Sequence, residues 1–197
     1  MRRLIPDSPP IHGPLVHWPM PDQFRIGHGY DLHRLEPRPP AGTGRPLVLG
    51  GVPLEHTHGP ISHSDGDALF HAITDALLGA LALPDIGQLF PDTDPRHESR
   101  NSAEFLTAAN DLLARRGWRV GNLDATVILE RPKLGPHKEA MRATIARLIG
   151  VDVAAVNIKG KTHERVDAVG EGRAVEVHVV ALLVRAAEYS GSGPRED

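Results

Sequence analysis

Asp67, His71 and Asp75 are spaced four residues apart in an otherwise apolar stretch of the chain. In a helix this spacing places the three side chains on one face, one turn above another. Ionisable groups on a mostly apolar helix need a partner, and a metal ion or a polar ligand could be that partner. A core histidine satisfied by hydrogen bonds is the alternative, and the spacing alone leaves both interpretations open.

Asp31 and His33 form a second group of ionisable residues. They lie two apart in an alternating stretch, residues 24–33, which predicts a strand with both side chains on one face. A carboxylate and an imidazole so placed, roughly 7 Å apart along the strand, could share a cation. They could equally form a hydrogen-bonded surface pair. The glycines Gly27 and Gly29 in this strand would let another backbone or a ligand approach closely.

Two loops carry further charged groups. Residues 85–95 form a turn-rich acidic loop with apolar Ile86, Leu89 and Phe90, which could line a site or simply cap a helix. Residues 130–136 read as a rigid turn that carries cations.

Hydrophobic periodicity predicts the elements that must position these groups. Helices are expected at residues 65–81, with Ser64 or Asp65 as N-cap, and at 102–116 and 137–149. Strands are expected at 24–33, at 46–54 in two pieces broken by Gly50 and Gly51, and at 122–129, 156–164 and 175–184. The last strand is long and apolar enough for the middle of a sheet. This order predicts an α+β fold with one sheet and helices against one face.

Composition narrows the class of protein. The 197 residues suit a single domain, and a net charge of −3 gives no basic footprint for nucleic acid or membrane. Without cysteine, a zinc site would need His and carboxylate ligands. Residues 1–23 are expected to be an irregular extension and 188–197 a flexible tail. They show neither a signal nor a transit peptide, so we expect a bacterial cytoplasmic protein and judge a plastid unlikely.

Five blocks of sequence, in order, carry a family resemblance. They are Arg25–His33, His63–Asp67 with His71, Thr74 and Asp75, Asp85–Gly87 with Phe90–Asp94, Pro132–Lys133, and Lys161–Glu164. Between about Phe24 and Arg185 the chain thereby resembles the 2-C-methyl-D-erythritol 2,4-cyclodiphosphate synthases.

The resemblance implies an enzyme of non-mevalonate isoprenoid biosynthesis. It would convert 4-diphosphocytidyl-2-C-methyl-D-erythritol 2-phosphate to 2-C-methyl-D-erythritol 2,4-cyclodiphosphate and release CMP. It also implies a single α+β domain, residues 24–187, of ferredoxin-like or bacillus-chorismate-mutase-like topology, and a homotrimer with active sites between subunits. A zinc-dependent phosphohydrolase and a non-catalytic trimeric nucleotide- or metal-binding module are the alternatives.

The resemblance also assigns roles to single residues. Asp31, His33 and His71 would bind one zinc ion, and Glu164 a second divalent cation, magnesium or manganese. His63 and Thr162 would donate hydrogen bonds to the transferring phosphate. Substrate would contact Ser64, Asp85, Ile86, Gly87, Phe90, Pro91, Asp92, Thr93, Asp94, Lys161 and His163. The cytidine diphosphate pocket would comprise Leu129, Glu130, Arg131, Pro132, Lys133, Leu134 and Gly135.

Two points go beyond the roles that the resemblance implies. Asp67 and Asp75 are expected to accept hydrogen bonds that orient the imidazole ligands, with capping or a substrate hydroxyl as the alternative. Ala168 and Glu171 stand where many bacterial members place phenylalanine and arginine, as in a plant-type variant of this segment, so neither is assigned to binding. A phosphate or isoprenoid diphosphate at the trimer axis is therefore in doubt, unless Arg173 substitutes.

Overall fold

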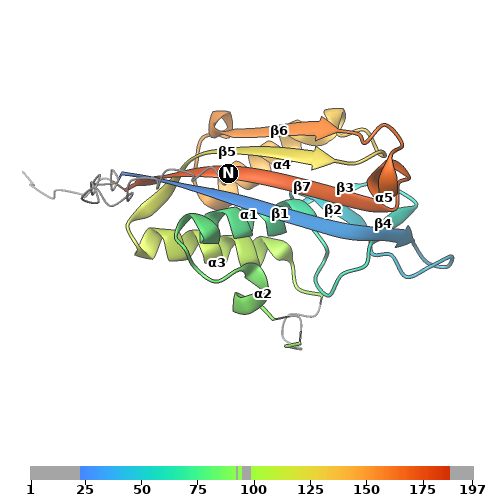
Figure 1. Ribbon diagram of the computed structural model, residues 1–197, viewed down its shortest axis with the longest axis horizontal. Helices are drawn as coiled ribbons and strands as arrows, with labels where there is room; N and C mark the ends of the chain where they lie inside the picture. Colours follow the sequence, from blue (N-terminus) through green and yellow to red (C-terminus); the bar gives the residue numbers. More distant parts are fainter. Residues whose placement is uncertain (1–22, 92, 95–98, 187–197) are drawn as a thin grey trace, which may run out of the picture.

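The computed structural model describes residues 23–91, 93–94 and 99–186 (Figure 1). The expected N-terminal extension, residues 1–23, and C-terminal tail, residues 188–197, fall outside this part of the chain except for residue 23. The described residues form one α+β unit around one main hydrophobic core. The domain division proposed from the sequence stays a prediction.

The sheet has five strands, arranged in the order β4-β1-β7-β5-β6. They are β1 (Phe24–Pro37), β4 (His58–Pro60), β5 (Trp118–Ile128), β6 (Val156–Lys161) and β7 (Ala174–Arg185). Only the β5–β6 pair is parallel, so the sheet is mixed. β7 occupies the centre, which confirms the prediction from its apolar length.

Three helices lie on one face of this sheet (Figure 1). They are α1 (Ala68–Ala80), which packs against β1 and β7, α3 (Ser102–Arg115), which packs against α1, and α4 (Lys138–Ile149), which packs against β6. Gly150 ends α4 in the left-handed conformation that favours glycine. The expected helices are confirmed, and the single-turn helices α2 (Ile86–Leu89) and α5 (Asp167–Gly170) are additions.

Two glycines set how closely α1 approaches β1. A Cβ atom on Gly27 or Gly29 would lie 1.8 Å from a backbone oxygen of α1, that of Ala76 or Ala72 respectively. No larger residue fits without moving the helix. The close backbone approach predicted for this strand is therefore confirmed. It places His71 of α1 next to Asp31 and His33 of β1.

The expected N-cap of α1 is wrong. Neither Ser64 nor Asp65 caps the helix; Asp67 does, with Oδ1 accepting hydrogen bonds from the backbone N–H groups of Leu69 and Phe70, both at 3.1 Å. The same carboxylate accepts from Gly50 N at 2.9 Å and Gly51 N at 2.7 Å. These glycines form the turn of a small hairpin, β2 (Leu47–Leu49) and β3 (Val52–Leu54), which are the two strand pieces expected on either side of them. Asp67 thus ties the start of α1 to this hairpin.

Sequence periodicity missed two parts of the sheet. β4 has only three residues, His58, Gly59 and Pro60, and pairs with the end of β1. β5 begins at Trp118, four residues before the expected start, because an irregularity between Val120 and Asn122 breaks the alternation. Among the described residues no helix has the length and apolar character needed to cross a membrane.

Candidate metal centre and active site

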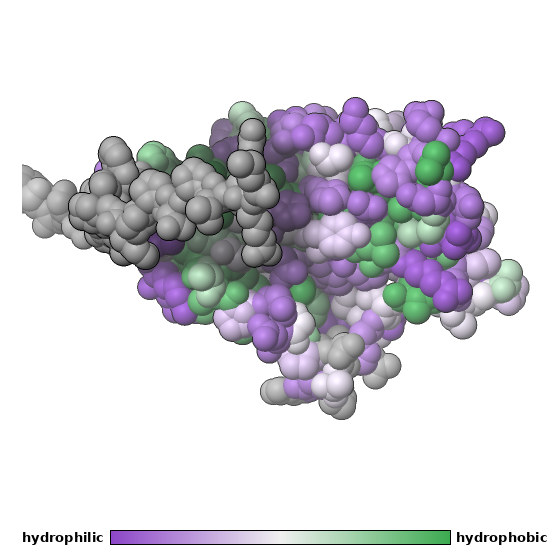
Figure 2. Space-filling model, viewed as in Figure 1, coloured by the Kyte–Doolittle hydropathy of each residue, from purple (hydrophilic) through white to green (hydrophobic). Residues whose placement is uncertain are grey.

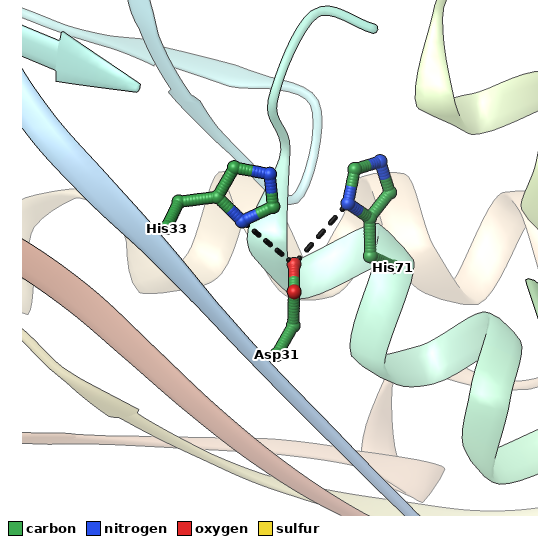
Figure 3. Close-up of side chains that lie close together, drawn as sticks. All are labelled: Asp31, His33 and His71. Atoms are coloured by element: carbon green, nitrogen blue, oxygen red, sulfur yellow. Dashed lines mark hydrogen bonds and ion pairs between the residues drawn. The ribbon is translucent and has the colours of Figure 1, made fainter. Parts of the chain in front are cut away.

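Asp31, His33 and His71 converge at the edge of α1 (Figure 3). One ligand atom from each lies within 4.8 Å of the other two. Asp31 Oδ2 is 2.9 Å from His33 Nδ1 and 3.2 Å from His71 Nδ1. Asp31 and His33 come from one face of β1, and His71 comes from the first turn of α1. The strand pair and the helical histidine, separate patterns in the sequence, therefore meet in one cluster.

The three groups shift each other's protonation. Burial alone would raise the pKa of Asp31, but the imidazoles of His33 and His71 outweigh it and hold that pKa at about 2. Burial alone would lower the pKa of His71, and the Asp31 carboxylate outweighs it and raises that pKa. The site therefore favours an ionised carboxylate and attracts positive charge.

His33 provides a test of whether a metal fits. Its Nδ1 is buried and makes no aligned hydrogen bond with any described group, although Asp31 Oδ2 is near enough for an ion pair. A buried polar atom without a hydrogen bond costs free energy unless something else satisfies it. Two ring nitrogens and a carboxylate oxygen are ligands that zinc accepts, and three protein ligands leave a position for substrate. These residues could therefore hold a metal ion.

The other ring nitrogen of His71 faces two serines. Nε2 lies 2.8 Å from Ser102 Oγ and 3.1 Å from Ser64 Oγ. Ser102 Oγ in turn donates a short hydrogen bond to Asp65 Oδ1. Ser64 was predicted to contact substrate; its side chain is buried here and contacts His71 and Ser102. Ser102 and Asp65 were not assigned this role from the sequence.

The expected roles of Asp67 and Asp75 are not supported by their contacts. The Asp67 carboxylate accepts hydrogen bonds from four backbone N–H groups, which is the capping alternative. Burial raises the pKa of Asp67 to about 6, although these hydrogen bonds act to lower it. Asp75 Oδ1 accepts from Ile86 N at 2.8 Å. Burial also raises the pKa of Asp75. Neither carboxylate makes a hydrogen bond to an imidazole ligand, so the two residues support the backbone around the site.

A cavity of about 330 Å³ opens beside His71. Its walls are Ser62, His63, Ser64, His71, Ile86, Gly87, Phe90 and Phe105. His63, Ser64, Ile86, Gly87 and Phe90 were all predicted site residues, and the structure brings them together here. Asp85 instead caps α2, accepting from Gln88 N at 2.8 Å. Pro91, Thr93 and Asp94 follow α2 in the chain, and Asp92 lies outside the described residues.

The other predicted site residues gather around the ends of β5 and β6. Leu129 N donates to Lys161 O at 3.0 Å, and Glu130 Oε1 accepts from His163 N at 3.0 Å. These bonds join the 129–135 turn to the 161–164 segment. Thr162 Oγ1 donates to Glu164 Oε1 at 3.2 Å.

Glu164 sits in an unusual stretch of backbone. Glu164, Arg165 and Asp167 all have positive φ, at 50°, 65° and 61°, which is strained for residues other than glycine. Glu130, Arg131 and Arg165 line a cavity of about 610 Å³, different from the one beside His71. Glu171 and Arg173, where the chain departs from many bacterial members, line the same cavity and form an ion pair with each other. Within one chain the predicted site residues are therefore divided between two places.

Comparison with known proteins identifies the family. A family model described as the YgbB family matches residues 24–184. A chloroplastic 2-C-methyl-D-erythritol 2,4-cyclodiphosphate synthase from Catharanthus roseus is 53% identical over 82% of this chain, which spans 66% of that enzyme. The synthase from Dechloromonas aromatica is 54% identical over 82% of this chain and 98% of its own length. A solved structure of such a synthase with bound CDP has a TM-score of 0.72 at 43% identity, over 81% of this chain and 99% of that one.

These relatives contradict the expected location. Three are chloroplastic plant enzymes that are 51% to 53% identical over 162 residues, as similar to this chain as the bacterial enzymes are. The exclusion of a plastid rested on the composition of residues 1–23, nearly all of which lie outside the described part of the chain. The prediction of a bacterial cytoplasmic protein is therefore withdrawn.

Proposed function

This chain belongs to the YgbB family, and on that basis we propose that it is a 2-C-methyl-D-erythritol 2,4-cyclodiphosphate synthase. It would convert 4-diphosphocytidyl-2-C-methyl-D-erythritol 2-phosphate to the cyclic diphosphate and release CMP. The observation that carries the proposal is the Asp31–His33–His71 cluster beside the cavity lined by His63, Ile86 and Gly87, in a chain about half identical to such enzymes.

The chemistry needs positioning and charge neutralisation more than a base. The 2-phosphate of the substrate attacks its own β-phosphorus, and CMP leaves. The nucleophile is already an anion, so the enzyme must fold a flexible chain back on itself and offset the repulsion between phosphates. The donors assigned to the transferring phosphate are His63, at the cavity, and Thr162, beside Glu164.

Each predicted residue has a part in that scheme. Asp31, His33 and His71 would hold zinc, which supplies Lewis acidity at a phosphate oxygen. Glu164 would hold magnesium or manganese, which prefer oxygen ligands and phosphates. Ile86, Gly87 and Phe90 would enclose the methylerythritol, and residues 129–135 would hold the cytidine diphosphate. Lys161 and His163 would add positive charge or hydrogen-bond donors near the phosphates.

A homotrimer would unite the two halves of the site, and we propose one, with the bacillus-chorismate-mutase-like topology of the family. Two observations support it. His71, which is assigned to zinc, lines one cavity, and Glu130 and Arg131, which are assigned to CDP, line a different cavity of the same chain. The sheet face opposite the helices also exposes apolar side chains, which are Ile26, Tyr30 and Leu32 on β1 and Val180 on β7. Figure 2 shows apolar patches among hydrophilic residues on the side seen in Figure 1. A second and third copy would cover this face.

Product identification tests the proposed reaction. The purified protein, supplied with zinc, magnesium and the diphosphocytidyl substrate, is expected to release CMP and the cyclic diphosphate in equal amounts, measured by ³¹P NMR and mass spectrometry. Release of inorganic phosphate would indicate a phosphohydrolase instead. Binding of CDP without turnover would indicate a non-catalytic module.

Replacing Glu164 with glutamine is expected to separate the two metal roles. The amide keeps the size of the side chain but loses its charge, so it binds magnesium poorly. We expect kcat to fall by at least about 10-fold and to lose most of its dependence on magnesium concentration. Zinc content, measured by atomic absorption, should stay unchanged.

Glu139→Gln is the matched control, because Glu139 is exposed on α4 and pairs only with Arg142 in the described structure. It should keep both the rate and the magnesium response. An unchanged magnesium response in Glu164→Gln would rule out the assigned role of Glu164.

A further inference from the structure

Two residues outside the assigned site contact the far side of His71. Nδ1 of this imidazole faces Asp31, whereas Nε2 faces Ser102 Oγ at 2.8 Å. Ser102 is fully buried at the start of α3, and its hydroxyl contacts Asp65 Oδ1 in a short hydrogen bond. Asp65, Ser102 and His71 therefore form a chain of hydrogen bonds that ends at the candidate metal centre.

The hydrogens of this chain can be assigned from what each group is able to donate. An ionised carboxylate only accepts, so the single hydroxyl hydrogen of Ser102 points to Asp65. Ser102 Oγ can then only accept a hydrogen bond from His71. Nε2 of His71 must therefore carry the hydrogen and donate it. A neutral imidazole with hydrogen on Nε2 has its free lone pair on Nδ1. A metal ion in the cluster would take this lone pair; without a metal, Nδ1 can carry a second hydrogen and donate it to Asp31 Oδ2, 3.2 Å away.

The backbone fixes this arrangement from several sides. Ser102 N donates to Asp65 Oδ2 at 3.1 Å, so the carboxylate accepts hydrogen bonds from both the hydroxyl and the backbone amide of Ser102. Asp65 N donates to Arg100 O at 3.1 Å, and Asp65 Oδ1 also accepts from Asp67 N at 3.2 Å. Since α3 packs against α1, these bonds tie the loop before α1 to the start of α3. The position of the Ser102 hydroxyl is therefore set by the fold and does not depend on a bound metal.

We propose that Ser102 and Asp65 are positioning residues that hold His71 in the tautomer with hydrogen on Nε2 and aim Nδ1 at the metal. Outer partners of histidine ligands act in this way, and their loss weakens metal binding by about 10- to 100-fold. The inference rests on the metal site of the proposed function. It is tested by tautomer and metal affinity, so that its failure can be told apart from failure of the proposed reaction.

Two substitutions change the Asp65–Ser102–His71 hydrogen bonds in different ways. Ser102→Ala removes the acceptor and leaves Ser64 Oγ, 3.1 Å from Nε2, as the remaining partner. Asp65→Asn keeps the volume but reverses the polarity: the amide NH₂ can donate to Ser102 Oγ, whose hydrogen then turns to His71 Nε2 and moves the imidazole hydrogen to Nδ1. Thr107→Ala is the matched control, since Thr107 is exposed on the same helix and bonds only to Ala103 O in the described structure.

The experiment measures zinc affinity by competition with a chelator, and the His71 tautomer by ¹⁵N NMR of the metal-free protein. We expect Nε2 of His71 to carry a hydrogen in the parent chain and to lose it in Asp65→Asn, where Nδ1 alone carries one, and we expect about 10- to 100-fold weaker zinc binding in both Asp65→Asn and Ser102→Ala. Thr107→Ala should match the parent. An Nε2 without hydrogen in the parent, or parent-like zinc affinity in both variants, would overturn the proposal. If the parent binds no zinc, the proposed metal site fails, and the metal-free tautomer still decides how Ser102 and Asp65 act on His71.

Discussion

Replacing His71 with alanine is expected to abolish both zinc binding and turnover while leaving the chain folded. The substitution removes one of the three ligand atoms that lie within 4.8 Å of one another, and Asp31 and His33 alone cannot form a closed zinc site. The loss of zinc affinity should exceed the roughly 100-fold that removal of an outer partner costs. Turnover should fall with it, because the charge on the substrate phosphates is then no longer offset at this position.

The measurements are zinc content by atomic absorption, steady-state kinetics with the diphosphocytidyl substrate, and circular dichroism for the fold. His56→Ala is the control, because His56 lies in the β3–β4 connection and bonds to its neighbour His58. Its zinc content should match that of the parent. If His71→Ala kept its zinc and its activity, His71 would not be a metal ligand.

Most of the fold followed from local patterns, because each long element carries its own periodicity. β7 alternates buried and more exposed residues from Val175 to Val184, and its apolar length predicted the central position. The elements that were missed lack such a pattern. β4 is three residues long and is a strand only because β1 extends far enough to pair with it.

Part of the candidate site could also be predicted from local patterns in the sequence. Asp31 and His33 share a strand face by simple alternation, and the position of His71 opposite them depends on Gly27 and Gly29 admitting α1. Asp67 was misassigned because it caps the helix from outside. Its side chain turns back to the first N–H groups instead of continuing the stripe with His71.

Ser102 had no local signal at all. It lies thirty-one residues from His71 in the chain, and only the packing of α3 on α1 brings the two together. A serine at the start of a helix is common for capping reasons, so its residue type gave no indication of a contact with the site. Contacts of this kind depend on tertiary packing, and spacing along the chain cannot predict them.

Away from the metal site, the largest loss of turnover is expected from a charge placed on the open sheet face, which is the face opposite the helices. Ile26 on β1 is 72% exposed, and its neighbours on this face include Tyr30, Leu32 and Val180. If three copies bury this face, Ile26→Arg places an unpaired charge in an apolar interface, which costs several kcal/mol per subunit. The variant should therefore run as a monomer in light scattering. Turnover should be lost with it, because His71 of the zinc site and Glu130 and Arg131 of the CDP site line separate cavities of each chain.

Zinc binding distinguishes a folded but inactive Ile26→Arg monomer from a misfolded one. Asp31, His33 and His71 belong to one chain, so a folded monomer should still take up zinc with near-parent affinity while its turnover is lost. Val153→Arg is the matched control: Val153 is also an exposed apolar residue, but it lies in the turn just before β6, which packs against α4 on the helix side of the sheet. It should leave mass, zinc content and rate unchanged. A fully active Ile26→Arg monomer would show that one chain builds the whole site, and a variant that stayed trimeric would place the interface elsewhere.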